Sequence, residues 1–154
     1  MHDLTELNDF SRVFADKLFA RYPEWRKFAE AYSPGDTGPA MCLVVKVPVP
    51  ESADVDHQLT IYVDDEVTVD FDCFHCHYEW PPGSNESDSS RSALAFIEAI
   101  LTEKVGIISW WRGDKLAVST TFDPQFPDPL QPPTGTSRLR RRSWQGTFNA
   151  DIAI

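Results

Sequence analysis

The sequence contains no run of the roughly 20 apolar residues that a membrane-spanning helix requires. Its opening stretch, "MHDLTELNDF", lacks both the basic start and the apolar run of a signal peptide. It has only three cysteines, which cannot all pair with one another, so we expect free thiols in a reducing compartment. These absences favour a cytoplasmic protein that has no membrane partner.

Glycine is also scarce, with 7 residues, and the glycine-rich motifs of common enzymes do not occur. There is no nucleophile elbow, no phosphate-binding loop and no dinucleotide fingerprint. Cys73 and Cys76 have the C-x-x-C spacing, but no second such pair accompanies them and no helix is predicted to begin there. Zinc-ribbon and thioredoxin-type redox sites are therefore disfavoured, and we expect a protein without enzymatic activity.

Basic residues are nearly absent from the middle of the chain. Between Glu51 and Glu103 the sequence has 13 acidic residues and one basic residue, Arg91, which gives a net charge of −12. The rest of the chain has 11 acidic and 13 basic residues, which gives a net charge of +2. A surface as acidic as the middle segment repels nucleic acid and speeds association with a basic partner. The alternative is that the acidic residues only keep the protein soluble.

The length of 154 residues and the hydrophobic content of 42% predict a single domain over 1–154 with one core. Apolar residues at helical spacing predict an N-terminal pair of helices, 3–21 and 23–32, and a central helix over 88–104. Strands are predicted at 40–49, 57–63, 66–80, 105–111, 115–122 and 138–148. Because short turns join many of these strands, we expect an α+β fold with a mainly antiparallel sheet of about six strands and the helices on one face.

The stretch "VTVDFDCFHCHYEW", residues 67–80, holds two of the three cysteines and two of the four histidines. If it is one continuous strand, alternation places Cys73, His75 and His77 on the face that begins with buried valines. An open transition-metal site formed by these three residues, with Zn²⁺ as the expected ion, is therefore an alternative function. The other interpretation is a half-buried thiol beside two histidines that hydrogen-bond to their neighbours.

The opposite face of the same predicted strand, together with the turn before it, carries acidic and aromatic residues. Exposed aromatic residues beside charge are typical of protein interfaces, whereas catalysis by paired carboxylates is less favoured here. The sequence therefore predicts a binding surface for a basic protein partner. Its predicted contact residues are Asp64, Asp65, Glu66, Asp70, Asp72, Tyr78 and Trp80.

Arginines are concentrated near the end of the sequence, at Arg138 and at Arg140, Arg141 and Arg142. Such a run can contact nucleic acid phosphates. In an acidic protein with a strand pattern at this position, pairing with the protein's own carboxylates or protection of an edge strand is the simpler interpretation. We therefore expect no nucleic acid partner.

Residues 59–120 carry a resemblance to a known group of proteins. The segment contains "LTIYVDDEVTVDFDCFHCHYEW", the predicted helix "SALAFIEAILTEK" and the hairpin "GIISWWRGDKLAVST". It resembles small acidic bacterial proteins of uncharacterised function, similar to immunity proteins of polymorphic toxin systems, in which an E-[IV]-T-V-x-F strand leads into an H-x-H ending. His75 and His77 match that ending. The resemblance implies a cytoplasmic inhibitor that binds and neutralises a toxin domain, and a structural or regulatory subunit without a ligand is the other alternative.

Overall fold

Nine strands and two α-helices form the part of the chain that the computed structural model describes, namely residues 4–33, 41–78, 86–126 and 131–154. The strands form one five-stranded and one four-stranded antiparallel sheet, so the α+β class is confirmed. The chain divides into two compact units. The first comprises Met1–Pro48, Leu59–Asp70 and His75–Ala95, and the second comprises Val49–Gln58, Phe71–Phe74 and Phe96–Ile154. The single domain expected over 1–154 stays a prediction.

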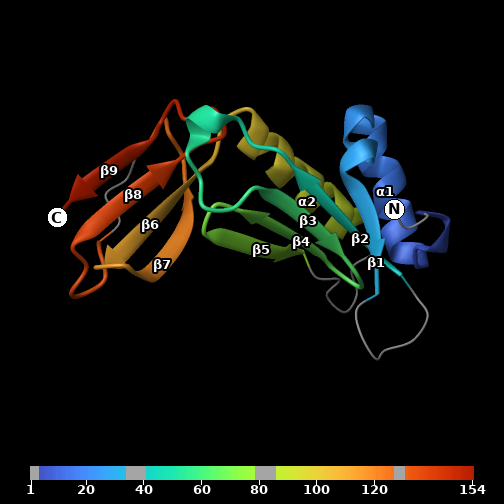
Figure 1. Ribbon diagram of the computed structural model, residues 1–154, viewed down its shortest axis with the longest axis horizontal. Coiled ribbons are helices and arrows are strands. Elements are labelled where there is room, and N and C mark those ends of the chain that lie inside the picture. Colours follow the sequence, from blue (N-terminus) through green and yellow to red (C-terminus); the bar gives the residue numbers. More distant parts are fainter. Residues whose placement is uncertain (1–3, 34–40, 79–85, 127–130) are drawn as a thin grey trace. The chain divides into compact units, whose positions relative to one another are not determined.

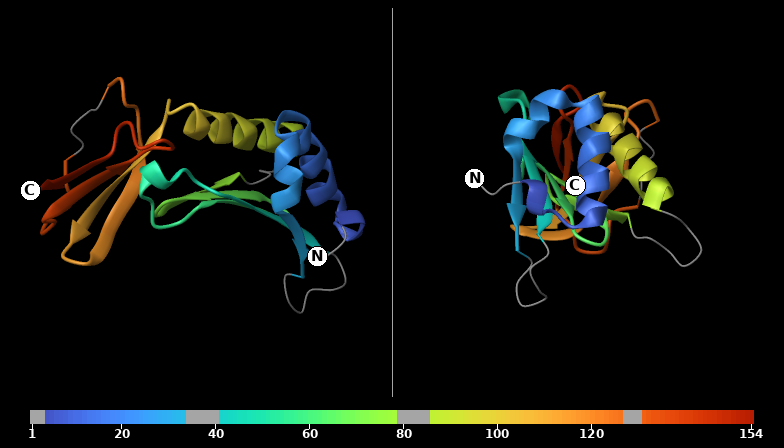
Figure 2. Two further views of the ribbon diagram at one scale, coloured as in Figure 1. Left: turned by 45° about the horizontal axis from the view of Figure 1, so that its top comes forward. Right: turned by 90° about the vertical axis from the view of Figure 1, so that its right-hand side faces the viewer.

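The five-stranded sheet belongs to the first unit, and its strands can be followed in Figure 1. Their order across the sheet is β1 (Ala29–Tyr32), β2 (Cys42–Val47), β3 (Leu59–Val63), β4 (Val67–Phe71) and β5 (Phe74–Tyr78). The unit also contains the 3₁₀ turn η1 (Leu4–Glu6), the helix α1 (Asp9–Arg21), the 3₁₀ helix η2 (Pro23–Phe28) and the start of α2 (Glu86–Leu101). Figure 2 shows α1 and η2 side by side, next to β1 and β2.

Local signals explain where the N-terminal helices begin. The side chain of Asn8 accepts a hydrogen bond of 2.7 Å from the backbone N–H of Ser11, which satisfies one of the free donors at the start of α1. Pro23 follows the end of α1 and opens η2, a position where its missing N–H costs little. The predicted interruption at Pro23 is therefore confirmed.

The predicted second helix over 23–32 is correct only in part. It ends as the 3₁₀ helix η2 at Phe28, and the chain continues as β1. In β1 the side chains of Ala29 and Ala31 are buried, whereas Glu30 between them is exposed. This alternation is that of a strand with one buried face, and pairing with β2 overrides the helical preference of alanine and glutamate.

The predicted single strand over 66–80 is wrong, because it is two strands joined by a turn. β4 ends at Phe71 and β5 begins at Phe74. Between them Asp72 has a φ of +55°, in the left-handed region that aspartate tolerates better than most side chains. The turn reverses the chain, so the face assignments made for a continuous strand do not hold beyond Phe71.

The four-stranded sheet belongs to the second unit and has the order β7-β6-β8-β9. Its strands are β6 (Gly106–Arg112), β7 (Lys115–Phe122), β8 (Arg138–Arg142) and β9 (Ala150–Ala153), and the short 3₁₀ turn η3 (Glu51–Ala53) precedes them in the chain. The hairpin of β6 and β7 turns at Gly113, with a φ of +60°, where the sequence predicted it. The predicted last strand over 138–148 is shorter than expected, and β9 was not predicted. Nine strands in two sheets thus replace the expected single sheet of about six.

Each unit has its own buried apolar residues. In the first unit the fully buried apolar side chains are Phe14, Leu18, Leu43, Val45, Leu59, Ile61, Val63, Val67, Val69 and Ala93. In the second unit they include Ile97, Ile100 and Ile107. Within the residues that the structure describes, no helix is both long enough and apolar enough to cross a membrane.

We predict that Leu43→Ala lowers the free energy of unfolding by about 3 kcal/mol, measured by urea denaturation. Leu43 is fully buried and lies between Ala31 and Val63 on the neighbouring strands, so its truncation leaves a cavity. The control is Lys46→Ala on the same strand, where the side chain is exposed and little change is expected. Equal losses in the two variants would show that β2 is not buried as described.

Candidate functional site

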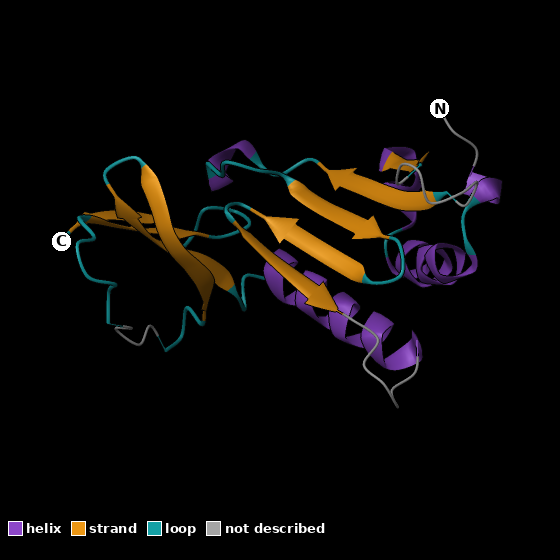
Figure 3. Cartoon of the chain, turned by 90° about the horizontal axis from the view of Figure 1, so that it is seen from below, coloured by secondary structure: helices purple, strands orange, loops and turns teal. Residues whose placement is uncertain are grey.

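The five-stranded sheet has one apolar face and one polar face. Val45, Ile61 and Val69 lie directly opposite one another on the apolar face and are fully buried. We call the opposite side the outer face, and Figure 3 looks onto it, with α2 on the far side of the strands. Its residues, assigned by cross-strand register and by side-chain contacts, are Glu30, Tyr32, Cys42, Val44, Lys46, Thr60, Tyr62, Asp64, Glu66, Thr68, Asp70, His75 and His77.

The outer face is acidic. Its carboxylates are Glu30 on β1, Asp70 on β4, and Asp64 and Glu66 in the turn between β3 and β4, with Lys46 on β2 as the single ammonium group among the outer-face residues. Asp65 adds a further exposed carboxylate at the turn between β3 and β4. Four of the predicted contact residues thus gather at one surface, where like charges spread over a sheet create a negative potential.

The acidic turn is shaped by its own first residue. The Asp64 carboxylate accepts hydrogen bonds from the backbone N–H groups of Asp65, at 2.7 Å, and Glu66, at 3.0 Å. An aspartate that bonds to the backbone in this way stabilises a tight turn. Asp64 therefore has a structural role beside any role in binding.

Two tyrosines that were not predicted as contact residues also lie on the outer face. The rings of Tyr32 and Tyr62 are perpendicular, with centroids 6.5 Å apart. Burial raises the pKa of Tyr32, and its neighbours Cys42 and Asp64 raise it further, so the phenol stays neutral. Tyr62 is 38% exposed. The alternation of Tyr62 with Ile61 and Val63 was a signal that could have identified it.

The histidines of β5 also lie on the outer face, not on the apolar face where the continuous strand placed them. Nδ1 of His77 lies 2.7 Å from a carboxylate oxygen of Glu66 and 3.0 Å from the hydroxyl of Thr68. The rings of His75 and His77 are 5.1 Å apart and perpendicular. Each histidine therefore belongs to the same polar surface as the carboxylates of β3 and β4.

The metal-site alternative is not supported by this geometry. Cys73 lies in the turn before β5 and does not share a strand with His75 and His77. Among the residues that the structure describes, no group of three or more histidine, cysteine, aspartate or glutamate side chains could hold a metal ion. Burial raises the pKa of the Cys73 thiol to about 11, and the charge of Asp72 adds to the effect, so Cys73 is a neutral thiol at pH 7.

A shallow cavity of about 380 Å³ flanks the outer face at β1 and β2. It is lined by Lys27, Phe28, Ala29, Glu30, Val44 and Lys46. The cavity places an apolar floor, from Phe28 and Val44, beside the carboxylate of Glu30. Lys27 and Lys46 add two ammonium groups to the same lining, so the cavity carries more positive than negative charge.

Three predicted contact residues are not on the outer face of the described chain. The side chain of Asp72 is 1% exposed and belongs to the second unit. Tyr78 alternates with His77 and therefore points to the opposite side of β5, where burial and a hydrogen bond with Cys76 raise its pKa. Trp80 lies outside the described residues. Because the chain turns at Asp72 and Cys73, these two side chains do not share a face with the other predicted contact residues, and their part in binding stays a prediction.

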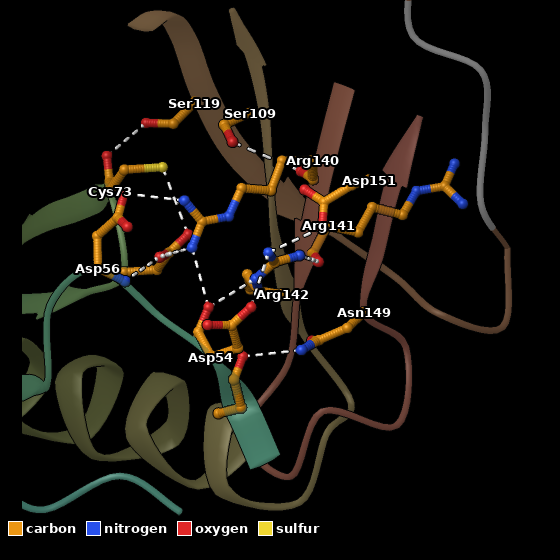
Figure 4. Close-up of polar contacts among 12 residues, drawn as sticks. Asp54, Asp56, Cys73, Ser109, Ser119, Arg140, Arg141, Arg142, Asn149 and Asp151 are labelled. Carbon is orange, nitrogen blue, oxygen red and sulfur yellow. Dashed lines mark hydrogen bonds and ion pairs between the residues drawn. The ribbon is translucent and has the colours of Figure 1, made fainter. Parts of the chain in front are cut away.

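Asp72 is part of a charge network in the second unit, shown in Figure 4. The guanidinium of Arg140, 9% exposed, donates to the carboxylates of Asp56 at 2.9 Å and Asp72 at 3.3 Å, and to the backbone carbonyl of Asp54 at 3.0 Å. Burial would lower the pKa of Arg140, but Asp72 and Asp56 raise it above its usual value. The buried arginine is therefore charged and closely surrounded by acceptors.

Arg142 forms the second half of this network. Its Nε donates to the backbone carbonyl of Asp54 at 2.7 Å, and a terminal nitrogen lies 3.3 Å from the Asp54 carboxylate and 3.0 Å from Asp151. The expectation that the arginines pair with the protein's own carboxylates is thus confirmed for Arg140 and Arg142. The expectation of an edge strand is wrong, because β8 lies between β6 and β9.

Comparison of the chain with protein-family models, with curated proteins and with solved structures finds no match. The resemblance of residues 59–120 to immunity proteins therefore stays a prediction.

We predict that Asp72→Asn lowers the free energy of unfolding by about 3 kcal/mol, because it leaves a buried arginine short of one negative partner. Asparagine has nearly the same shape and also tolerates a positive φ, so backbone strain does not contribute. The control is Asp151→Asn, which removes a 51% exposed partner of Arg142 and should cost less than about 1 kcal/mol. Equal costs, measured by urea denaturation, would contradict the role of the buried pair.

We predict that Cys73 reacts slowly with iodoacetamide at pH 8, and that its rate increases about tenfold per pH unit up to about pH 10, because its pKa is about 11. The measurement uses a Cys42→Ala, Cys76→Ala variant, in which Cys73 is the one remaining thiol. When the same variant is unfolded in urea, the rate of its reaction with iodoacetamide should stop increasing near pH 9. Because the pKa is raised in the folded state, the stability that this thiol contributes is complete below about pH 9 and is lost above it. If the reaction rate of the folded protein stops increasing by pH 9, the raised pKa of Cys73 is contradicted.

Proposed function

We propose that this protein is an immunity-type inhibitor that binds a basic toxin domain through the outer face of its five-stranded sheet. The observation that carries the proposal is the collection of Glu30, Asp64, Glu66 and Asp70 on one face together with a single lysine. The resemblance of residues 59–120 to immunity proteins points to the same kind of activity.

Electrostatics give such a surface a defined role in binding. Oppositely charged surfaces steer the two proteins together and raise the association rate, most strongly at low ionic strength. Many toxin domains act on nucleic acid and carry a basic cleft for phosphate. An acidic sheet face can occupy such a cleft in place of the phosphate backbone, and the inhibitor then acts by blocking access.

Aromatic residues supply the contact energy that exposed charges lack. Exposed ion pairs contribute little to affinity, whereas tyrosines at the centre of an interface often contribute most. Tyr62 is partly exposed at the middle strand of the sheet and is supported from the side by the ring of Tyr32. We expect Tyr62 to be an anchor, with the carboxylates around it providing orientation and speed.

The proposed activity is binding without catalysis, in the cytoplasm. The polar groups of the outer face are spread across the sheet and face outward, which suits a protein surface better than the enclosed site of an enzyme. The three cysteines are free thiols, with Cys42 buried and Cys73 and Cys76 half-buried, which suits a reducing compartment.

We predict that the protein forms a complex with the product of the gene next to its own, and that Glu30→Gln combined with Asp64→Asn slows association about tenfold at low salt. The asparagine that replaces Asp64 retains an oxygen that can accept the turn hydrogen bonds, so the turn is preserved. The measurement is surface plasmon resonance, with cell survival on co-expression as the functional readout. Tyr62→Ala should instead raise the dissociation rate.

The matched control is Asp16→Asn combined with Glu24→Gln. It removes the same net charge from exposed positions on α1 and η2, and its association rate should stay within about twofold of the original. Two results would contradict the proposal: the absence of any complex at low salt, or equal slowing by the two double variants.

A further inference from the structure

The four arginines of β8 are divided into two groups by their partners. Arg140 and Arg142 bind four aspartates of the second unit. Arg138 and Arg141 form no ion pair with any residue that the structure describes, and their Nε atoms are buried without a hydrogen-bond acceptor there. Each instead lies over an aromatic ring: Arg138 is 5.0 Å from the centroid of Trp111, and Arg141 is 5.6 Å from that of Phe122.

The pair of Arg138 and Trp111 forms a flat platform on one face of the four-stranded sheet. The two residues lie directly opposite each other on β8 and β6. The Trp111 indole N–H donates a hydrogen bond of 2.8 Å to the hydroxyl of Ser109, which fixes the ring. On the other side of Arg138 lies the small residue Ala153, its partner on β9.

The surroundings of this platform are apolar on one side. Leu116, opposite Trp111 on β7, is 42% exposed. The turn that joins β6 to β7 carries Arg112 and Lys115 together with one acid, Asp114. Arg112 and Lys115 lie opposite each other and alternate with Trp111 and Leu116, so their side chains point to the other face, and Arg138 is the cationic group of the platform itself.

We infer that the Arg138–Trp111 platform is a second interaction surface, which binds an acidic protein segment carrying an apolar side chain beside its carboxylate. A carboxylate can accept two parallel hydrogen bonds from the planar guanidinium of Arg138, and the terminal nitrogens supply them because Nε is buried. The neighbouring side chain of the segment then covers Leu116. Tryptophan and arginine held rigidly together are the residues most often found at the energetic centre of interfaces.

Charge and chemistry favour a protein segment over nucleic acid. The protein has a net charge of −10, which repels an extended phosphate chain but acts less on a short segment with one or two carboxylates. The exposed leucine beside the platform gains from an apolar neighbour, which phosphate and sugar do not provide. This surface belongs to the second unit, whereas the outer face belongs to the first, so the inference does not depend on the proposed function.

The test is an NMR titration of the whole ¹⁵N-labelled chain with a short blocked peptide in which glutamate and leucine alternate. Saturable shifts are expected for the Arg138 Nε–H and the Trp111 indole N–H. The indole N–H of Trp110, which alternates with Trp111 and points to the opposite face, should not move. Peptides with glutamine or lysine in place of glutamate should bind at least about tenfold more weakly.

The variant Arg138→Gln should weaken peptide binding about tenfold, whereas Arg141→Gln should change it less than about twofold. Arg141 is a matched control because it lies on the same strand, is stacked on an aromatic ring and points to the opposite face of the sheet; Figure 4 shows its side chain directed away from the arginine–aspartate cluster. Backbone spectra verify that both variants are folded. The inference is overturned if the Trp111 and Arg138 signals do not saturate, if both variants lose affinity equally, or if a thymidine oligonucleotide binds the platform more tightly than the peptide.

Discussion

The buried guanidinium of Arg140 is the constraint on which the second unit depends. Removing this charge from water is costly, and the cost is offset only because Asp56, Asp72 and the carbonyl of Asp54 all point at it. Two of these aspartates have a positive φ, +50° at Asp54 and +55° at Asp72, which is an unfavourable backbone conformation held in place by the same contacts. The Arg140 side chain thus joins three segments that are separated in the sequence.

The turn at Asp72 also decides which residues reach the outer face. Side chains alternate along a strand, so a shift of one residue moves every following side chain to the other face. Because the chain turns at Asp72 and Cys73, β5 returns along β4 with His75 and His77 beside Thr68 and Glu66. A residue buried in the second unit thus determines the chemistry of a surface on the first.

The sequence allowed most of the elements to be predicted, but not the features that depend on distant contacts. The hairpins of β3 with β4 and of β6 with β7 follow from alternating apolar residues around short turns, and the apolar face at Val67 and Val69 was assigned correctly. The turn at Asp72 was missed because it contains no glycine or proline. Its φ of +55° is stabilised by Arg140, which is 68 residues away in the sequence.

For the candidate site, too, local features were predicted from the sequence and features that depend on distant contacts were not. The carboxylates at Asp64–Glu66 and Asp70 were predicted at the surface, since a polar turn and alternation with buried valines are local signals. The strand β1 was predicted as helix because Trp25 and Tyr32 continue the helical spacing of the apolar residues before them, so Glu30 was not recognised as a surface residue of a sheet. Only pairing with β2, a tertiary contact, establishes the strand.

The distribution of charge takes on a different meaning once the ion pairs are known. The segment from Glu51 to Glu103 has a net charge of −12, yet Asp54, Asp56 and Asp72 within it are bound by the arginines of β8. They contribute to folding, and their charge is largely cancelled at any surface. Among the residues that the structure describes, the carboxylates of the outer face are not bound in this way. Of the four arginines of β8, two form ion pairs and two form none within the described chain, and one of these is Arg138 of the platform. Net charge alone therefore could not reveal which carboxylates are bound by arginine and which lie on the outer face.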